Sequence, residues 1–354
     1  MQRKLIADFS KRDNNEDKML REFFKNPQNR GFAREPVLAL MNNGTLVCTF
    51  LTGGVIEPWC DNVILIKRSY DKGETWSDAE ILFSHSRYGL WCTEIFVDDE
   101  KATMIVSMYD GSCPFLLLQT FVSYSYDNGE TWSKPTMLSP AFCTDSVRKT
   151  LVMSNGEILL PLYYTISTDC FEWNPKEMYK EEFWYGTHHE CAVAISSDKG
   201  KTFEKYGRIW SEKYSLWENN CVELKDGHIV MYMRADVPQT GYLATSESFD
   251  YGRTWTEPKL TDIENPGTKL TVFKFRKKLF LISNFDKKDR INLQMRISSD
   301  EGKSWEKIIS LDDDSKMFCY PHVAIDEKNQ VMYIAYENFE QHYLDVFSFD
   351  EIGL

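Results

Sequence analysis

Short apolar segments of strand length recur along the chain, and tight turns separate them. Residues 62–69 (NVILIKRS) and 190–197 (ECAVAISS) are rich in β-branched and other apolar residues, as strands are. Asn-Gly and Asp-Gly pairs, as in MNNGTLV at 41–47 and LKDGHIV at 224–230, favour hairpin turns between such segments. Residues 14–24 (NNEDKMLREFF) have the apolar spacing of an amphipathic helix. The pattern predicts a protein built almost wholly from antiparallel strands.

A nine-residue turn motif occurs five times. The first copy is SYDKGETWS at 69–77, in which Asp71 can bond the backbone ahead of it and Gly73 supplies a positive φ. Four further copies follow the same pattern, at 125–133, 196–204, 248–256 and 298–306. Their intervals of roughly 50 to 70 residues, with strand patterns between them, are typical of a repeat architecture. We therefore assign the motifs a structural role, in which Asp, Ser and Thr bond the turn backbone and Trp packs between strands.

Each repeat contains two strands joined by a turn, a third strand that runs into the motif, and a fourth strand after it. Four antiparallel strands per repeat describe a propeller blade. Five motifs mark five blades, residues 320–349 supply three strands of a sixth blade, and RKLIADF at 3–9 supplies its fourth. The sequence thus predicts an all-β fold, a six-bladed β-propeller closed by an N-terminal strand. It is expected to be a single domain over 1–354, with residues 1–30 contributing that strand and a short helical segment.

The composition narrows the range of partners. The 354 residues carry a formal net charge of -13, whereas nucleic-acid binding needs clustered Lys and Arg. An acidic surface still permits a small anionic substrate, provided that a few Arg residues converge locally. We expect no nucleic-acid partner, and a small acidic sugar or glycan remains compatible with the charge.

The cysteines and the first residues indicate a reduced compartment. Nine cysteines follow no framework spacing, and the absence of a CxxC pair argues against zinc or a redox dithiol. Cys48, Cys191, Cys221 and Cys319 lie in apolar segments, where a free thiol behaves as a small hydrophobic group. The first 24 residues carry charges where a signal peptide needs an apolar core, and no apolar run approaches the roughly 20 residues of a membrane span. We expect a cytoplasmic protein with no membrane partner, metal or cofactor.

The recurrent S-x-D-x-G-x-T-W motif resembles the Asp boxes (BNR repeats) of the sialidase (neuraminidase) superfamily. The resemblance implies a site built around an anionic sugar, whose carboxylate is held by three arginines. Arginine suits this task because its planar fork binds a carboxylate through two parallel hydrogen bonds. Three segments match the arginine-bearing segments of the family: FAREPVLAL at 32–40 with Arg34, WENNCVELKDGHIVMYMRAD at 217–236 with Arg234, and LISNFDKKDRINLQMRISSDEG at 281–302 with Arg290.

The resemblance also implies a tyrosine nucleophile. A carboxylate nucleophile would be repelled by the carboxylate on the anomeric carbon, whereas a neutral phenol is not. A phenol has a pKa near 10 and needs an adjacent base. FCYPHVAID at 318–326 matches the family's nucleophile region and offers Tyr320, with His322 two residues later where the family has a different sequence. Glu218 falls on the family's base position, and Glu337 is expected to orient Arg34.

The acid/base residue is less well matched. The family has an Asp on the loop before the first box, after a Gly-Arg pair, and here the loop at 49–69 has glycine in place of that arginine. Glu57 lies nearest the family position and Asp61 follows four residues later, so both carboxylates are candidates for protonating a leaving group. Trp91 and Trp217 lie outside the boxes, and Trp217 is a candidate for stacking on the sugar.

Three functions remain open at this stage. The resemblance implies an exo-acting glycoside hydrolase that releases a terminal sialic acid, or a related 2-keto sugar acid, with retention. The first alternative is a related propeller hydrolase or lyase acting on uronic-acid or rhamnosyl linkages through a central histidine, with His188-His189-Glu190 and His322 as candidates. The second alternative is a non-catalytic glycan-binding propeller, which would have no need of a Tyr–Glu pair.

Overall fold

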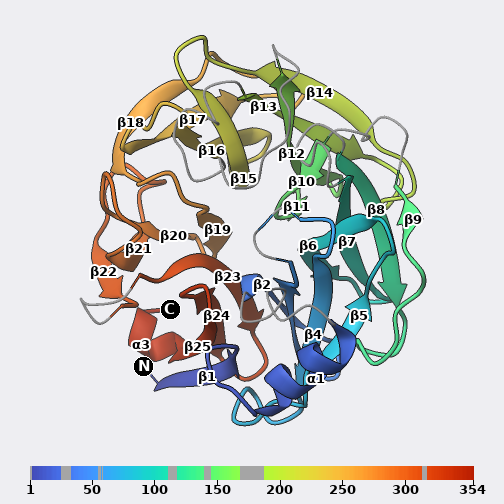
Figure 1. Cartoon of the computed structure of the whole chain (residues 1–354). Coiled ribbons are helices and arrows are strands. Elements are labelled where there is room, and N and C mark those ends of the chain that lie inside the picture. Colours follow the sequence, from blue (N-terminus) through green and yellow to red (C-terminus); the bar gives the residue numbers. More distant parts are fainter. Residues whose placement is uncertain are drawn as a thin grey trace. The chain divides into compact units, whose positions relative to one another are not determined.

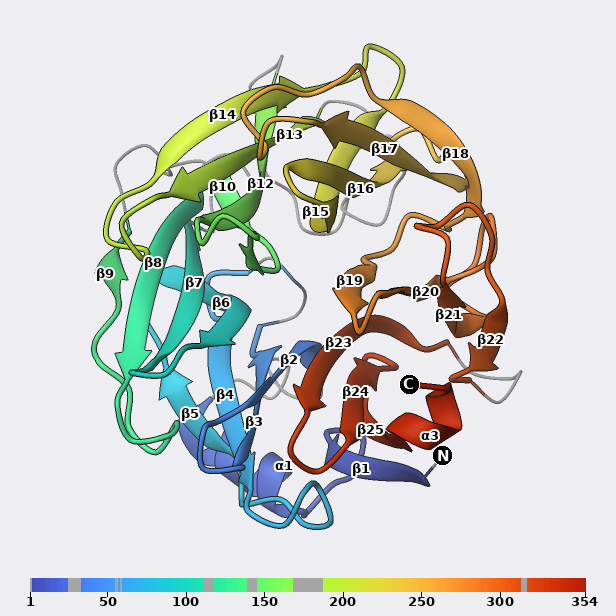
Figure 2. The same cartoon turned by 180° about the vertical axis from the view of Figure 1, so that it is seen from behind.

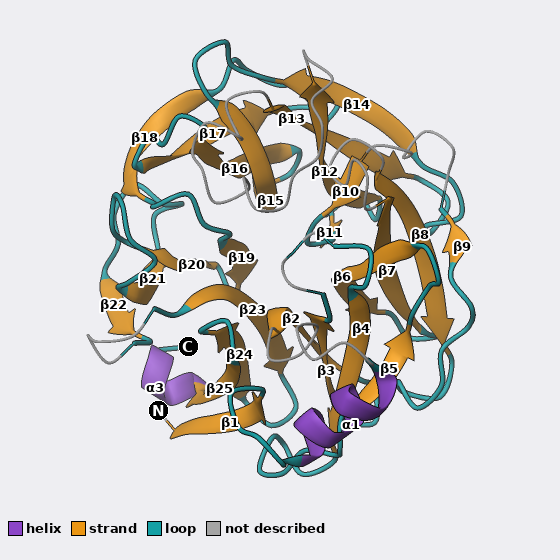
Figure 3. Cartoon of the chain, viewed as in Figure 1, coloured by secondary structure: helices purple, strands orange, loops and turns teal. Residues whose placement is uncertain are grey.

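The computed structural model describes residues 2–24, 33–54, 57, 59–110, 118–138, 145–167, 187–312 and 317–354 (Figure 1). The chain forms two compact units, which we call unit 1 (Met1–Leu138 and Tyr320–Leu354) and unit 2 (Ser139–Cys319). Each unit contains three antiparallel sheets, whose strands are consecutive in the chain except that β1 joins the last sheet of unit 1. Strands dominate the described residues and helices are few (Figure 3).

The three sheets of unit 1 are four-stranded. The first contains β2 (Ala33–Leu40), β3 (Leu46–Thr52), β4 (Val63–Ser69) and β5 (Glu80–Phe83); the second contains β6 (Tyr88–Val97), β7 (Ala102–Asp110), β8 (Leu118–Ser125) and β9 (Thr136–Met137); the third contains β23 (Cys319–Asp326), β24 (Val331–Glu337), β25 (Gln341–Ser348) and β1 (Gln2–Asp8).

The sheets of unit 2 follow the same order, and the inner edge of the first is divided between two short strands (Figure 2). The first contains β10 (Asp145–Val147), β11 (Leu151–Val152), β12 (Ile158–Ser167), β13 (Thr187–Ser196) and β14 (Glu204–Ile209); the second contains β15 (Ser215–Lys225), β16 (His228–Asp236), β17 (Tyr242–Ser248) and β18 (Lys259–Glu264); the third contains β19 (Thr271–Phe275), β20 (Lys278–Asn284), β21 (Leu293–Ser298) and β22 (Lys307–Ser310).

The N-terminal strand completes the last sheet. β1 pairs antiparallel with β25, so that Arg3 lies opposite Asp345 and Leu5 opposite Tyr343. Arg3 also contacts the buried carboxylate of Asp345, with Nε 3.4 Å from Oδ1. Six sheets of this kind, the last closed by the N-terminal strand, make a six-bladed β-propeller and confirm the predicted fold.

The five Asp boxes connect the third and fourth strands of their sheets, as predicted. In the first box, Ser69 Oγ donates to Asp71 Oδ1 at 2.8 Å and accepts from the backbone N–H of Gly73 at 2.8 Å. The backbone N–H of Thr75 donates to Asp71 Oδ1 at 2.9 Å. The same Asp contacts recur in the other boxes, at Asp127, Asp198, Asp250 and Asp300. The Asp and Ser side chains of the boxes thus hydrogen-bond the turns in which they lie, which confirms the structural role predicted for the boxes.

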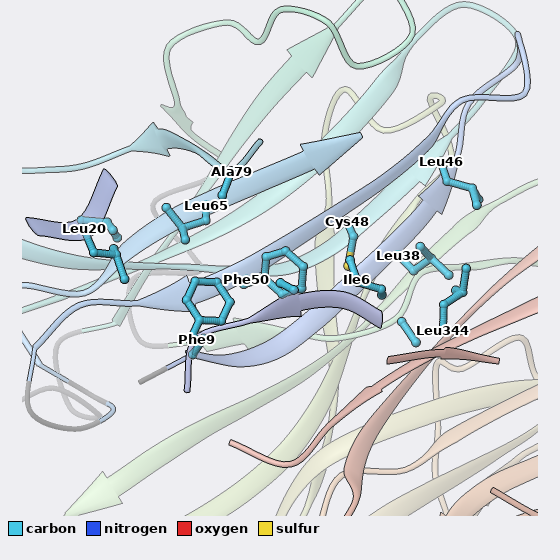
Figure 4. Close-up of a cluster of buried hydrophobic side chains, with 14 of the residues drawn as sticks. Ile6, Phe9, Leu20, Leu38, Leu46, Cys48, Phe50, Leu65, Ala79 and Leu344 are labelled. Atoms are coloured by element: carbon cyan, nitrogen blue, oxygen red, sulfur yellow. The ribbon is translucent and has the colours of Figure 1, made fainter. Parts of the chain in front are cut away.

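The predicted amphipathic helix is α1 (Asn15–Phe23), and it covers part of the core of unit 1. Asn14 caps it by accepting from the backbone N–H of Asp17, and Leu20 is buried. A second short helix, α3 (Phe349–Ile352), follows β25. Figure 4 shows the core cluster beneath α1, which gathers side chains from several elements: Ile6, Phe9, Leu20, Leu38, Leu46, Cys48, Phe50, Leu65, Ala79 and Leu344. This core holds β2 and β3 rigid, and those strands carry part of the candidate site.

The described residues contain neither a membrane-spanning helix nor a cluster of metal ligands. No helix among them is both long and apolar enough to cross a membrane. Within the same ranges, no three His, Cys, Asp or Glu side chains are grouped so as to hold a metal ion. The free cysteines of the described residues include Cys48, Cys191, Cys221 and Cys319, all buried, as expected for small core residues.

Candidate active site

Two predicted site residues, Glu218 and Tyr320, lie on inner strands in the left-handed backbone region, and so does Glu35, the neighbour of the predicted Arg34. Glu35 has a φ of 52°, Glu218 a φ of 46° and Tyr320 a φ of 55°. The β2–β3 register shifts between Arg34 and Val37, and an equivalent shift in β15 surrounds Glu218. A bulge inserts an extra residue and re-aims its side chain, and non-glycine residues in this region persist only where neighbouring contacts hold them. The local backbone thus singles out these positions.

In unit 1, Arg34 is the centre of a cluster that joins β2, β23 and β24. Its Nε donates to Glu337 Oε1 at 2.9 Å, and its Nη1 lies 3.6 Å from Glu57 Oε2. The guanidinium lies over two rings, with its carbon 4.6 Å from the centroid of Tyr320 and 4.1 Å from that of Phe339. Glu337 is fully buried, so its carboxylate is committed to fixed partners. The structure therefore brings three other sequence-predicted residues, Glu337, Glu57 and Tyr320, to the guanidinium of Arg34.

The turn that carries Glu57 is anchored by Asn62. The buried Asn62 accepts from the backbone N–H of Trp59 at 2.7 Å and from the hydroxyl of Tyr109, and donates to the carbonyl of Gly53. Its own carbonyl accepts from the backbone N–H of Leu90 at 3.0 Å. These contacts tie the turn to β6 and β7. Sequence reasoning missed this role of Asn62, although its position directly before β4 was a signal for a turn-holding residue.

The structure distinguishes the two acid/base candidates. Glu57 is half-buried and contacts Arg34, whereas Asp61 lies exposed on the same turn. A carboxylate needs partial desolvation to hold a proton near neutral pH. The geometry therefore favours Glu57.

In unit 2, Glu218 is the centre of a second cluster, clamped by two arginines. Arg234 Nη1 donates to Glu218 Oε2 at 2.8 Å, and Arg148 Nη2 donates to Glu218 Oε1 at 3.4 Å. Arg234 also contacts Asp236, with Nη2 2.6 Å from Oδ2. Arg148 is among the largest fully buried side chains, and sequence reasoning missed it. Its signal was an arginine five residues before MSNGEIL at 153–159, a segment with an Asn-Gly hairpin pair.

The charges around Glu218 keep it ionised. Burial, the largest single effect, favours the protonated carboxyl, but Arg234, Arg148 and Arg290 together outweigh it and hold the pKa of Glu218 well below its usual range. Arg290 donates through Nη2 to the carbonyl of Gly267 at 3.3 Å. The two arginines that the sequence places in this unit, Arg234 and Arg290, therefore act electrostatically on one carboxylate.

Trp217 is packed against residues of the Glu218 cluster. Its ring stacks on His189, with centroids 4.1 Å apart and planes 14° apart, and the Arg234 guanidinium lies 4.0 Å from its centroid. Its Nε1 donates to Asp236 Oδ1 at 2.5 Å, and the residue is 6% exposed. Trp217 thus supports the Arg234 guanidinium, and its stacking on a sugar stays a prediction. Trp91 is also buried and donates to Glu35 Oε2 at 3.0 Å.

Two of the histidines considered for a lyase lie inside the fold. His189 is fully buried, and burial, with Arg234 and His188 adding to it, lowers its pKa to about 3. His322 accepts at Nδ1 from the backbone N–H of Leu38 at 3.3 Å, and its Nε2 lies 3.5 Å from the buried Glu94. Glu190, the neighbour of His189, is bound through both oxygens by Arg208. These contacts give His189 and His322 structural environments rather than access to a substrate.

Comparisons with known proteins agree with the propeller fold. The structure is similar to the Hadza microbial sialidase Hz136, with a TM-score of 0.73 and 17% sequence identity, covering 91% of this chain and 68% of that chain. It is similar to the intramolecular trans-sialidase from Ruminococcus gnavus, with a TM-score of 0.68 and 14% identity, covering 92% of this chain and 96% of that chain. It is also similar to a protein of unknown function from Dyadobacter fermentans, with a TM-score of 0.65 and 18% identity, covering 89% and 94% of the two chains.

Sequence comparison identifies the family. No curated protein matches the chain. The family model of the BNR repeat-like domain matches residues 116–333, which is more than half of the chain and includes four of the five Asp boxes. The chain therefore belongs to the BNR repeat-like domain family.

Proposed function

We propose that this protein is an exo-acting glycoside hydrolase of the sialidase type, which releases a terminal sialic acid or related 2-keto sugar acid with retention. The observation that carries the proposal is the Arg34 cluster, in which one guanidinium contacts Glu337 and Glu57 and lies over the ring of Tyr320. An anion site beside a phenol and a half-buried carboxylate supplies the groups that this chemistry needs. The similarity to sialidases and to a trans-sialidase supports the same reaction class.

The proposed reaction begins with a covalent step. The Tyr320 oxygen bonds to the anomeric carbon while the bond from that carbon to the leaving oxygen breaks. The phenolic proton passes to Glu218, and Glu57 gives its proton to the leaving oxygen. Arg34, Arg234 and Arg290 bind the sugar carboxylate throughout, because each guanidinium can offer paired N–H donors.

Substrate binding prepares Glu57 for this role. In the free protein Glu57 is a partner of Arg34. A substrate carboxylate that binds Arg34 neutralises part of the positive charge of the guanidinium and places a second anion near Glu57. Both effects favour the protonated form of Glu57. In the second step water bonds to the anomeric carbon and gives a proton to Glu57. The Tyr320 oxygen leaves and recovers its proton from Glu218, so the enzyme returns to its starting state.

The two alternatives make different predictions. A histidine-based lyase needs an accessible imidazole, and the burial of His189 and His322 counts against those two residues as its base. A glycan-binding propeller has no use for a phenol held in a left-handed backbone conformation, since maintaining such strain costs of the order of 1–3 kcal/mol. We therefore keep the hydrolase as the proposed function.

The test is incubation with a fluorogenic aryl α-sialoside, with the released sugar followed by proton NMR. A retaining hydrolase releases the α-anomer first, before mutarotation. An unsaturated product that absorbs in the ultraviolet would instead identify a lyase. Binding of the sialoside without turnover would identify a glycan-binding protein. If the protein shows no binding and no turnover, an α-sialoside is rejected as its ligand.

A further inference from the structure

Arg148 is an arginine for which the proposed reaction has no role. It follows β10 directly, and its backbone N–H donates to the carbonyl of Pro161 at 2.8 Å. Its Nη2 donates to the hydroxyl of Tyr163 at 3.1 Å and to Glu218 Oε1 at 3.4 Å. The guanidinium carbon lies 5.1 Å from the centroid of the Tyr163 ring. Two different groups thus hold the same end of this side chain.

The two arginines that bind Glu218 differ in solvent exposure, and this difference indicates different roles. The side chain of Arg148 is 1% exposed, and that of Arg234 is 11% exposed. A guanidinium that solvent does not reach cannot be a first contact for an incoming sugar. Burying an arginine is costly unless a carboxylate and further acceptors compensate it, which Glu218 and Tyr163 do here. Arg148 therefore acts through Glu218 and not on a ligand.

The two oxygens of Glu218 are divided in the same way. Oε1 is taken by the buried Arg148, and Oε2 by the more accessible Arg234. Arg234 also contacts Asp236, so its charge is already shared before any ligand arrives. An anionic sugar at Arg234 would weaken the hold on Oε2 and leave the hold on Oε1 unchanged.

We propose that Arg148 is a positioning residue that fixes Glu218 through Oε1, so that Oε2 is kept for proton transfer when a substrate anion engages Arg234. This inference rests on the proposed function. The left-handed backbone of Glu218 gives an independent reason for such a clamp, because strain of this kind needs contacts that over-determine the conformation.

The charges that face Glu218 come from several elements. The cations are Arg148 after β10, Arg234 on β16 and Arg290 between β20 and β21. His189 on β13 also interacts electrostatically with Glu218, and its low pKa leaves it neutral at working pH. Removing Arg148 therefore takes away one of three positive charges. The Glu218 carboxylate then gains freedom to rotate and binds a proton more readily.

The first experiment compares Arg148→Met and Arg148→Lys with the wild type on the aryl α-sialoside. We expect Arg148→Met to lower kcat by about tenfold or more, because a mispositioned base loses much of its usual contribution. KM should stay within about twofold, because Arg148 does not touch the ligand. The acid limb of the pH profile should move to higher pH, and Arg148→Lys should restore the limb and part of kcat by restoring the charge.

The matched control is Arg253→Met. Arg253 Nη2 donates to both carboxylate oxygens of Glu157, also within unit 2, and Arg253 is not part of the Glu218 cluster. This variant removes an arginine–carboxylate pair and should leave kcat and the acid limb as in the wild type. An Arg148→Met protein with unchanged kcat and an unmoved acid limb would overturn the proposal. If Arg148→Met does not fold, Tyr163→Phe removes one anchor of Arg148, keeps every charge and should lower kcat with little change in KM.

A second measurement does not depend on activity. Because the folded pKa of Glu218 is depressed, its ionised form stabilises the fold above the ordinary carboxyl pKa, and this contribution is lost as pH falls toward the folded value. The Tm difference between wild type and Arg148→Met should be largest near pH 7 and shrink as pH falls below about 5. A Tm difference that is constant with pH would show that Arg148 stabilises the fold through packing alone, and it would overturn the inference. If the wild type is inactive on the sialoside but the Tm difference has the expected pH dependence, the proposed function is overturned. The inference that Arg148 fixes Glu218 is then retained.

Discussion

The guanidinium of Arg34 lies 4.6 Å from the ring centroid of Tyr320, and the two residues come from opposite ends of the chain. They meet because β2 and β23 are the inner strands of the two sheets at the start and end of unit 1. A cation held against a phenol ring by Glu337 is already placed beside the predicted nucleophile. Binding and bond formation would then share one small cluster.

Replacing Tyr320 with Phe tests the nucleophile. The substitution removes the hydroxyl and keeps the ring that stacks on Arg34, so anion binding should survive while turnover falls by about a thousandfold or more. Turnover is measured with the aryl α-sialoside, and binding by calorimetry with 2-deoxy-2,3-didehydro-N-acetylneuraminic acid. Tyr70→Phe is the control, because Tyr70 is an exposed box residue. Near wild-type turnover in Tyr320→Phe would rule out the tyrosine mechanism.

Replacing Arg34 with Lys tests the anion contact. Lysine keeps the charge but loses the paired donors and the flat face that lies between Tyr320 and Phe339. We expect kcat/KM to fall by about tenfold to a hundredfold, a loss of about 1.4 to 2.7 kcal/mol of transition-state stabilisation. Steady-state kinetics on the α-sialoside give kcat/KM for the variant and the wild type. Arg276→Lys, at an exposed arginine, is the control. An unaffected Arg34→Lys enzyme would remove Arg34 from the site.

Glu57→Gln and Asp61→Asn assign the general acid by a matched pair of variants on one turn. We expect Glu57→Gln to lose far more activity toward a natural sialyl-galactoside than toward the aryl sialoside, because a phenolate leaves with little protonation. Asp61→Asn should behave as the wild type toward both substrates, because Asp61 is exposed. The measurement is the ratio of kcat/KM for the two substrates. A leaving-group effect in Asp61→Asn and none in Glu57→Gln would reverse the assignment.

The fold was predictable because its signals are local and repeated. Each Asp box encodes one turn through contacts within nine residues, and the five copies count five blades. The contribution of β1 followed from a missing strand, and its pairing with β25 bears this out. Hydrophobic pattern and turn chemistry together left few other arrangements.

The candidate site was less predictable because its contacts join residues far apart in sequence. Arg34 and Glu337 were paired through the family resemblance, and the structure places them in contact. Arg148 belongs to no motif, and its burial against Glu218 depends on how β10 and β15 pack. The packing of His189 and Arg234 against the ring of Trp217 was likewise not apparent from the sequence. Burial of polar side chains is a tertiary property, and composition does not encode it.

Asp345 should make the stability of the fold depend on pH at the point where β1 closes the last sheet. Burial, opposed by Arg3, raises the pKa of Asp345 to about 6, above its ordinary value near 4. For an acid with a raised pKa the folded state holds the proton more tightly, so this group favours folding most at low pH. That contribution is lost as pH rises from about 4 to about 6.

The variant Asp345→Asn removes this titration and keeps the shape of the side chain. Its Tm minus that of the wild type should therefore grow more positive between pH 4 and pH 7. A two-unit shift limits the corresponding change in the free energy of unfolding to roughly 3 kcal/mol. Scanning calorimetry at several pH values measures this, and Asp262→Asn, at an exposed residue of β18, serves as the control. A Tm difference that stays constant with pH, or that falls as pH rises, would show that Arg3 compensates the buried Asp345 charge fully and that the strand closure does not titrate.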